Sequence, residues 1–213
     1  ARMIHYNSPW AKNDLIFFDC QSIPQELQEP HLFGEETSNE GGVKIESRPG
    51  LIEKAHMGTL VMSNIHRLNP KCQPMLSRVL REEKTTRMGG TQFYRAYVRV
   101  IATSRKQAFE QAATASEQFK KDIYSLFAEN IIEIKPLHER PEDIPILIAA
   151  MAKRFAEMMG KEIKKIDKEV VDRLTLYDFP GNNRELESMV EAAVIRCVGD
   201  TLRTEHFNLP GGE

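Results

Sequence analysis

Short apolar runs separated by long polar spacers dominate the first two-thirds of the chain. Four runs have this form: 15–18, 59–62, 97–102 and 131–134. Such near-continuous apolar runs, partly β-branched, are typical of strands buried on both faces of a parallel sheet. The spacers are long enough to hold the crossover helices that parallel strands require. The pattern therefore predicts an α/β fold with four parallel strands.

One spacer, residues 69–83, has the signals of an amphipathic helix. Asn69 is a capping residue type, Pro70 suits a first helical position, and apolar side chains recur along one side. Pro74 conflicts with this assignment, because a proline beyond the first turn removes a helix hydrogen bond. Residues 88–90 (Met-Gly-Gly) and the aromatic residues after them predict a turn and a hairpin.

The last third has the periodicity of amphipathic helices. The first helix is expected between Pro141 and Gly160, the second after a cap at Asp167, and the third after a cap at Asn182 or Asn183. The residues expected on the inward faces are Ile144, Leu147, Ile148, Met151, Phe155, Met158, Val170, Val171, Leu174, Leu186, Met189, Val190, Ala193, Val194 and Cys197. Three such helices predict a small bundle.

This change of periodicity places a domain boundary near Pro136. We expect an α/β part over residues 1–136 and an all-α part over residues 137–213. A length of 213 residues fits one to two domains. Residues 1–5 read like the middle of a helix without a cap, so we expect the chain to be part of a longer protein.

Charge and composition exclude several classes of protein. Lys and Arg number 29 against 31 Asp and Glu, which argues against a basic nucleic-acid-binding surface over this chain. No run approaches the roughly 18 apolar residues of a membrane span, so we expect no integral membrane protein. Cys20, Cys72 and Cys197 are odd in number and far apart, and the histidines lack metal-ligand spacing. We therefore expect a cytoplasmic protein without a metal site.

The apolar run 59–62 ends in Ser63 and Asn64, at a place where chemistry would be expected. In P-loop ATPases a strand of this kind ends in acids that position magnesium and polarise the attacking water. A hydroxyl and an amide bind a hydrated Mg²⁺ poorly and are not general bases at pH 7. The phosphate-cradling pattern Gly-x-x-x-x-Gly-Lys-Ser/Thr is also absent from the sequence. Local chemistry alone favours a core strand with polar ends.

Arg184 is a second candidate, because it is expected in the first turn of the third helix of the predicted bundle. A cation there opposes the helix dipole, at a cost of about a few tenths of a kcal/mol. A residue that breaks a local rule invites a functional explanation, and an anionic partner such as a phosphate would supply one. An ion pair with Glu185 or Glu187 would be the structural explanation.

Nine stretches occur in order from end to end of the chain. They are ARMIH (1–5), DCQSIP (19–24), LFGEE (32–36), AHMGTL (55–60), LSRVL (76–80), VRVIAT (98–103), FKKDIY (119–124), PLHERPEDI (136–144) and PGNNREL (180–186). As a set they resemble the AAA+ central domain of bacterial enhancer-binding proteins, the sigma-54-dependent transcription activators. The resemblance implies a P-loop-NTPase-like (AAA+) parallel sheet with flanking helices, followed by a small all-α helical lid.

Set against this family, the chain departs at the positions that carry the ATPase chemistry. The family's phosphate-binding loop lies just before the position of Ala1. Its metal-binding Asp and catalytic Glu fall on Ser63 and Asn64, and its two trans-acting arginine fingers fall on Lys120 and Leu126. The resemblance therefore implies no cofactor in this chain, with ATP and Mg²⁺ possible only if an upstream phosphate-binding loop exists.

Two further family positions are altered and one is kept. The sensor asparagine falls on Ser104 or Arg105, depending on a one-residue gap. The loop that touches the sigma factor falls within residues 37–43, which lack its aromatic residue and its threonine contact. Only the lid arginine, Arg184, is kept. Ser63, Asn64 and Arg184 are thus vestigial nucleotide-binding positions.

These departures imply a degenerate AAA+ domain without ATPase activity. Its expected role is a signal-relay and self-association module between an upstream sensory domain and a downstream DNA-binding domain, with DNA contacted only through that flanking domain. The altered loop argues against sigma-54 contact. Two alternatives stay open: an active ATP-hydrolysing sigma-54 activator, which needs substitutes for each lost residue, and a nucleotide-sensing domain that binds without hydrolysis through Arg184.

Overall fold

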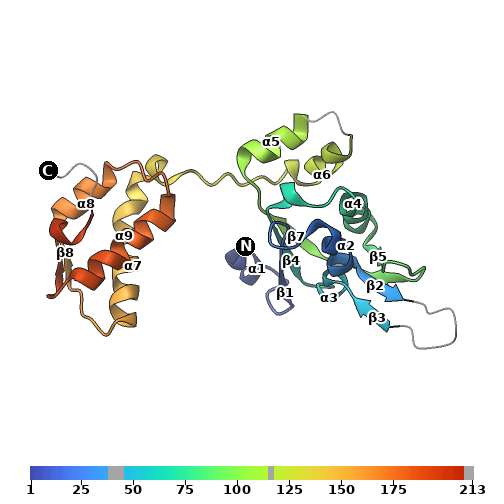
Figure 1. Cartoon of the computed structure of the whole chain (residues 1–213), viewed down its shortest axis with the longest axis horizontal. Helices are drawn as coiled ribbons and strands as arrows, with labels where there is room; N and C mark the ends of the chain where they lie inside the picture. The colour runs from blue at the N-terminus through green and yellow to red at the C-terminus, as the bar shows by residue number, and fades with distance from the viewer. Residues whose placement is uncertain (38–45, 115–117, 209–213) are drawn as a thin grey trace. The chain divides into compact units, whose positions relative to one another are not determined.

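The computed structural model describes residues 1–37, 46–114 and 118–208 (Figure 1). The contacts divide the chain into two units, Ala1–Ile132 and Glu133–Glu213, and each is described by itself. The division lies a few residues before Pro136, where the sequence analysis places the boundary. Each unit has a hydrophobic core of its own.

The first unit is built on a parallel sheet with the order β1-β4-β7. Its strands are β1 (Leu15–Asp19), β4 (Thr59–Ser63) and β7 (Arg99–Ala102). Leu15 pairs with Thr59, and Thr59 pairs in turn with Arg99. The central strand β4 is almost entirely buried, in agreement with its apolar sequence. Three of the four predicted strands are therefore confirmed.

The fourth predicted strand is wrong. Residues 131–134 form neither helix nor strand, and Ile131, Ile132 and Ile134 are 52%, 76% and 82% exposed. A strand needs a neighbour to complete its hydrogen-bond ladder, and no described strand pairs with this run. Apolar, β-branched composition alone therefore does not define this segment.

Helices flank the sheet of the first unit: α1 (Arg2–Tyr6), α2 (Gln25–Phe33), α3 (Leu51–Lys54), α4 (Cys72–Glu82), α5 (Lys106–Thr114) and α6 (Gln118–Ala128). A short 3-10 helix, η1 (Ile65–Arg67), follows β4. Phe18, Leu60 and Met62 point from one sheet face into the core. On the opposite face α1 supplies His5, whose ring Nδ1 lies 2.9 Å from the hydroxyl of Thr59.

Two antiparallel hairpins complete the first unit. One joins β2 (Gly34–Thr37) to β3 (Glu46–Pro49), and the other joins β5 (Lys84–Thr86) to β6 (Phe93–Arg95). The second is the hairpin predicted after residues 88–90. Gly34 has a φ of 82°, and a Cβ there would lie 2.3 Å from the carbonyl oxygen of Arg48. Only glycine therefore fits where the first hairpin begins.

Helix α4 removes the conflict that Pro74 posed. The helix begins at Cys72, so Pro74 lies in the first turn, where a backbone N–H has no helical partner to lose. Asn69 lies outside the helix, and its side-chain oxygen accepts a hydrogen bond of 2.9 Å from the N–H of Lys71. The predicted helix exists, with a later start than its capping signals indicated.

The second unit is the predicted helical bundle. It contains η2 (Leu137–Glu139), η3 (Pro141–Asp143), α7 (Ile144–Met158), α8 (Lys168–Thr175), α9 (Asn182–Arg196) and η4 (Thr204–His206). Two short parallel strands, β8 (Lys165–Ile166) and β9 (Thr201–Leu202), join its loops. Most predicted inward residues lie in or against one core. Two residues are exceptions: Met158 is 74% exposed at the end of α7, and Val171 is only half-buried and lies outside this core.

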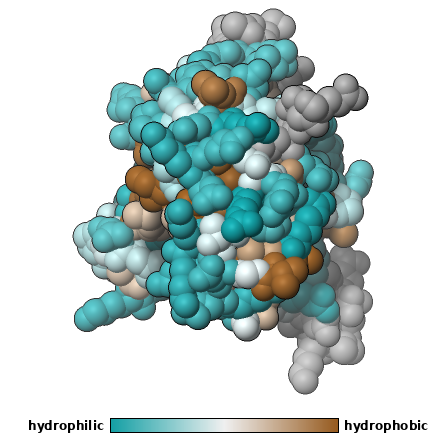
Figure 2. All heavy atoms as spheres, turned by 90° about the vertical axis from the view of Figure 1, so that its left-hand side faces the viewer, coloured by the Kyte–Doolittle hydropathy of each residue, from teal (hydrophilic) through white to brown (hydrophobic). Residues whose placement is uncertain are grey.

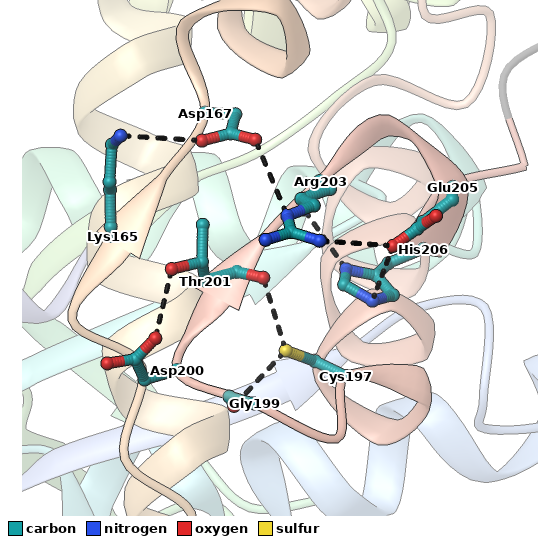
Figure 3. Close-up of polar contacts among 9 residues, drawn as sticks. All are labelled: Lys165, Asp167, Cys197, Gly199, Asp200, Thr201, Arg203, Glu205 and His206. Carbon is teal, nitrogen blue, oxygen red and sulfur yellow. Dashed lines mark hydrogen bonds and ion pairs between the residues drawn. The ribbon is translucent and has the colours of Figure 1, made fainter.

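Asp167 is the N-cap residue of α8, as predicted, but the residues predicted to cap α8 and α9 make no capping hydrogen bond with their side chains. Asp167 precedes α8, but its carboxylate makes ion pairs with Lys165 (3.7 Å) and Arg203 (3.9 Å) and no capping bond (Figure 3). Asn182 also makes no cap, because its side-chain oxygen accepts the N–H of Leu137 at 2.7 Å. At α9 the carboxylate of Glu185 accepts the N–H of Gly181 at 2.7 Å. Tertiary contacts use the side chains that local rules assign to capping.

Hydrophilic side chains cover most of the molecular face presented in Figure 2, with separate hydrophobic patches between them. No helix in the described part of the chain combines the length and the apolarity that a membrane crossing needs.

Candidate functional site

The carboxyl ends of β1, β4 and β7 lie at one edge of the sheet, because the three strands are parallel. Asp19 pairs in register with Ser63. The N–H of Cys20 donates to the Ser63 carbonyl oxygen at 3.0 Å, and the N–H of Ile65 donates to that of Thr103 at 3.0 Å. These bonds hold the three strand ends together at the edge where open α/β sheets bind ligands.

Asn64 points toward Asp19 at this edge. Its backbone is left-handed, with a φ of 53°, and its amide Nδ2 donates to Oδ1 of Asp19 at 2.9 Å. The Ser22 hydroxyl and the Gln21 N–H also donate to the Asp19 carboxylate, at 2.7 and 3.0 Å. The hydrogen bond from Asn64, followed by those from Ser22 and Gln21, lowers the pKa of Asp19. Asp19 is therefore an ionised carboxylate at neutral pH.

Sequence reasoning missed Asp19. Its signal was its place as the last residue of β1, directly after the apolar run 15–18. The ends of neighbouring parallel strands meet, so an acid after one strand can serve a site whose other residues follow the next. Recognising this required the pairing of β1 with β4, which the sequence does not state.

The chemistry available at this edge is limited. A general base works best with a pKa near the operating pH, and the lowered pKa of Asp19 makes it a weaker base than an ordinary carboxylate. Within the described residues no group of three or more His, Cys, Asp or Glu side chains is arranged to hold a metal ion. The edge offers one hydrogen-bonded anion beside a hydroxyl and an amide.

Ser104 follows β7 at the same edge. Its hydroxyl lies 3.0 Å from Nδ1 of His66. Burial, followed by the charges of Arg67 and Arg105, lowers the pKa of His66, so its ring is neutral at neutral pH. Of the two sensor positions left open by the sequence, Ser104 therefore binds a neighbouring side chain, whereas Arg105 makes no side-chain bond to a described residue.

Arg184 is exposed in the first turn of α9, in the second unit. The ion pairs that would have explained it are absent among the described residues. Glu185 instead binds Gly181 and the hydroxyl of Tyr177, and Glu187 pairs with Arg154. The structural explanation offered for Arg184 is therefore wrong, and its guanidinium is available to an anion.

The remaining family positions are only partly described. Leu126 lies on α6 and packs against the first core. Lys120 is on the same helix, but its side chain lies outside the described residues, as does most of the loop 37–43. The predictions for Lys120 and for that loop therefore stay predictions.

Comparison with known proteins covers both units. The family described as "Sigma-54 interaction domain" matches residues 1–134, and the family described as "AAA+ ATPase lid domain" matches residues 138–210. The "DNA-binding transcriptional activator HyfR" of Escherichia coli strain K12 is 35% identical over 209 residues, which are 98% of this chain and 31% of HyfR. The "Transcriptional regulatory protein ZraR" of the same strain is 34% identical over 209 residues, 98% of this chain and 47% of ZraR.

Among solved structures, NtrX from Brucella abortus in complex with ATP matches with a TM-score of 0.77 and 26% identity. The match covers 97% of this chain and 45% of NtrX. The chain thus spans between 31% and 47% of the length of these three relatives.

Proposed function

The chain belongs to the family of sigma-54 interaction domains, with an AAA+ lid, and from this premise we propose that it is an ATPase-inactive member that acts by self-association. It is the AAA+ module of a bacterial transcriptional regulator. In our proposal it relays a signal from an upstream sensory domain to a downstream DNA-binding domain in the cytoplasm. The shares of HyfR and ZraR that it spans leave room for such domains.

The proposed loss of hydrolysis rests on the side chains found at the strand ends, which are Asp19, Ser63 and Asn64. Asn64 stands at the position of the family's catalytic glutamate, and its amide donates a hydrogen bond to Asp19. An amide is not a base, so this position supplies none. Losing a single arginine finger lowers phosphoryl transfer by about 10³–10⁵-fold. Losing the base and the metal ligand as well leaves no normal route to hydrolysis.

Self-association is supported by apolar surface on the first unit. Met3, Phe17 and Tyr6 are exposed by half or more, and so are Ile131 and Ile132 at the end of this unit. Large apolar side chains that gather on a surface are typical of protein interfaces. A second copy of the protein would cover them.

Nucleotide binding without hydrolysis is the second candidate function. Arg184 favours it, because this guanidinium has no partner among the described side chains and lies at the start of a helix. NtrX, with a similar fold, has been crystallised with ATP. If this candidate is correct, Arg184→Ala removes nucleotide binding; unchanged affinity contradicts it.

The first experiment is a calorimetric titration of Mg-ATP into the full-length protein, followed by a steady-state hydrolysis assay. We expect no turnover above the rate without protein. Sedimentation velocity over a range of protein concentrations measures self-association, and we expect oligomers. Turnover at the rate of an active relative assayed in parallel overturns the ATPase-inactive proposal, and a monomer at every concentration overturns the self-association proposal.

A further inference from the structure

A cavity of about 370 Å³ lies beside the strand-end edge of the first unit. Its described walls come from η1, the start of α4, the turn after β7 and the helices α5 and α6. Pockets of this volume hold small molecules, and they recur outside the carboxyl ends of parallel strands. The cavity contains none of Ser63, Asn64 and Arg184, and of the family positions named above it includes Arg105, one of the two candidate sensor positions.

One part of the wall is strongly positive. His66, Arg67 and Arg105 all line the cavity, and both arginines are exposed. The three residues line the same cavity, and after burial the charges of the two arginines help to lower the pKa of His66. Neither guanidinium has an ion-pair partner among the side chains that the structure describes. Among the described side chains, the cavity therefore holds two cations without an ion-pair partner.

Another part of the wall is aromatic. The rings of Phe109 and Tyr124 lie with centroids 4.7 Å apart at an interplanar angle of 36°. Both rings line the cavity together with Ile65 and Ile123, which are buried. A planar ring can pack against such a wall by offset or tilted stacking.

We propose that this cavity binds a small molecule that combines a planar ring with a carboxylate or a phosphate group. Arg67 and Arg105 hold the anionic group, because the guanidinium fork matches the oxygens of both groups. Phe109 and Tyr124 receive the ring. In a regulator, such a site gives the AAA+ core a ligand of its own in addition to the signal from a sensory domain.

The test uses full-length protein and three probes with one ring: 1-naphthyl phosphate, 1-naphthoate and the neutral 1-naphthamide. Calorimetry measures affinity, and NMR of labelled histidine follows the His66 ring. We expect an anionic probe to bind at least about tenfold more tightly than the amide, since hydrogen bonds to charged groups are worth this much. The anion also offsets the arginine charges and raises the pKa of His66. The tighter of the two anionic probes identifies the anionic group.

Two variants separate this site from non-specific binding. Arg67→Gln with Arg105→Gln removes both charges at exposed positions, and we expect at least about a tenfold loss of affinity. Arg81→Gln is the matched control, because Arg81 is exposed on α4 and does not line the cavity. We expect Phe109→Leu to weaken the binding of both anionic probes, because it removes an aromatic ring from the wall without changing the charge of the cavity. Equal binding of the amide, full affinity in the double variant, or no His66 response up to about 1 mM probe overturns the proposal.

Discussion

Burial decides what the cysteine side chains can do. Cys20 and Cys72 are buried in the first core, and burial raises the pKa of each thiol to about 12. The charge of Asp19 also raises the pKa of Cys20, and the charge of Glu29 that of Cys72. The thiolate is the reactive form, and at pH 8 a thiol with this pKa is ionised in about one molecule in ten thousand. These cysteines are packing residues.

We therefore expect Cys20 and Cys72 to resist alkylation in the folded protein. Iodoacetamide at pH 8 should leave both unmodified over a time in which the urea-unfolded chain reacts fully. Mass spectrometry of the digested protein measures the modification at each site. Rapid labelling of either thiol in the folded protein would show that its part of the core opens readily.

The pair of Asp19 and Asn64 gives a second prediction at this scale. Asn64→Ala removes the largest cause of the lowered pKa of Asp19, so that pKa should rise. A lowered folded-state pKa stabilises the protein above the unfolded pKa, and this stabilisation is lost as the pH falls through the folded value. The variant should thus be less stable than the parent at neutral pH, and the difference should shrink in acid.

Carboxyl-carbon NMR of Asp19 and urea unfolding at several pH values measure these two effects. Asn130→Ala is the control, since Asn130 is exposed in the turn after α6 and its side chain makes no bond to Asp19. An unchanged Asp19 titration in Asn64→Ala would show that Ser22 and Gln21 alone determine the ionisation.

At the scale of elements, the end of α9 depends on a residue from another segment. The ammonium group of Lys161 donates to the carbonyl oxygens of Val194, Ile195 and Cys197 at 2.8, 2.7 and 2.9 Å. The last carbonyls of a helix have no internal partners and form the negative end of its dipole. One lysine from the loop after α7 thus caps α9 and ties the two elements together.

We expect Lys161→Met to destabilise the lid by about 1–3 kcal/mol, because charged hydrogen bonds are lost while the side-chain length is kept. Thermal unfolding followed by circular dichroism measures the change. Lys164→Met is the control, since the Lys164 ammonium makes an exposed ion pair with Glu162 at 3.5 Å and no other bond to a described residue. If the two substitutions lower the stability equally, the loss comes from removing a positive charge and not from the hydrogen bonds to the end of α9.

The sequence predicts elements well where their signals are local. The buried run 59–62 and the periodicity of α7 and α9 are confirmed, because continuous apolar character and helical spacing need no knowledge of a partner. Residues 131–134 fail because a strand also needs a neighbour. Asn182 fails as a cap because a tertiary contact to Leu137 takes its side chain. The sequence alone does not tell which strands pair and which side chains make tertiary contacts.

The same limit applies to the candidate site. The sequence identifies Ser63, Asn64 and Arg184 through a family pattern, and the structure adds how each is engaged. Asp19 joins the first two only through strand pairing. Arg184 has no ion pair with a described residue, because Glu185 and Glu187 bind elsewhere. It is therefore easier to predict from the sequence which residues belong to the site than to predict which of them contact one another.

At the scale of the whole molecule, the apolar residues left exposed raise the question of what covers them. Ile131, Ile132 and Ile134 lie where the first unit ends and the second begins, and they pack in neither core. Surface isoleucines outside a core contribute little to stability, so the triple Ile→Ser substitution should change the free energy of unfolding by no more than about 0.5 kcal/mol per residue.

If a second copy covers this segment, the same triple variant should associate more weakly. The three isoleucines would be buried from water when the interface forms, and burial of apolar surface contributes about 25 cal/mol per Å² to the free energy of association. The triple variant loses this contribution. Sedimentation velocity of the full-length variant and parent measures the change, with Val198→Ser as a control on the fully exposed apolar residue of the second unit. Association equal to that of the parent would place the interface elsewhere, with the exposed Met3, Tyr6 and Phe17 as the next segment to substitute.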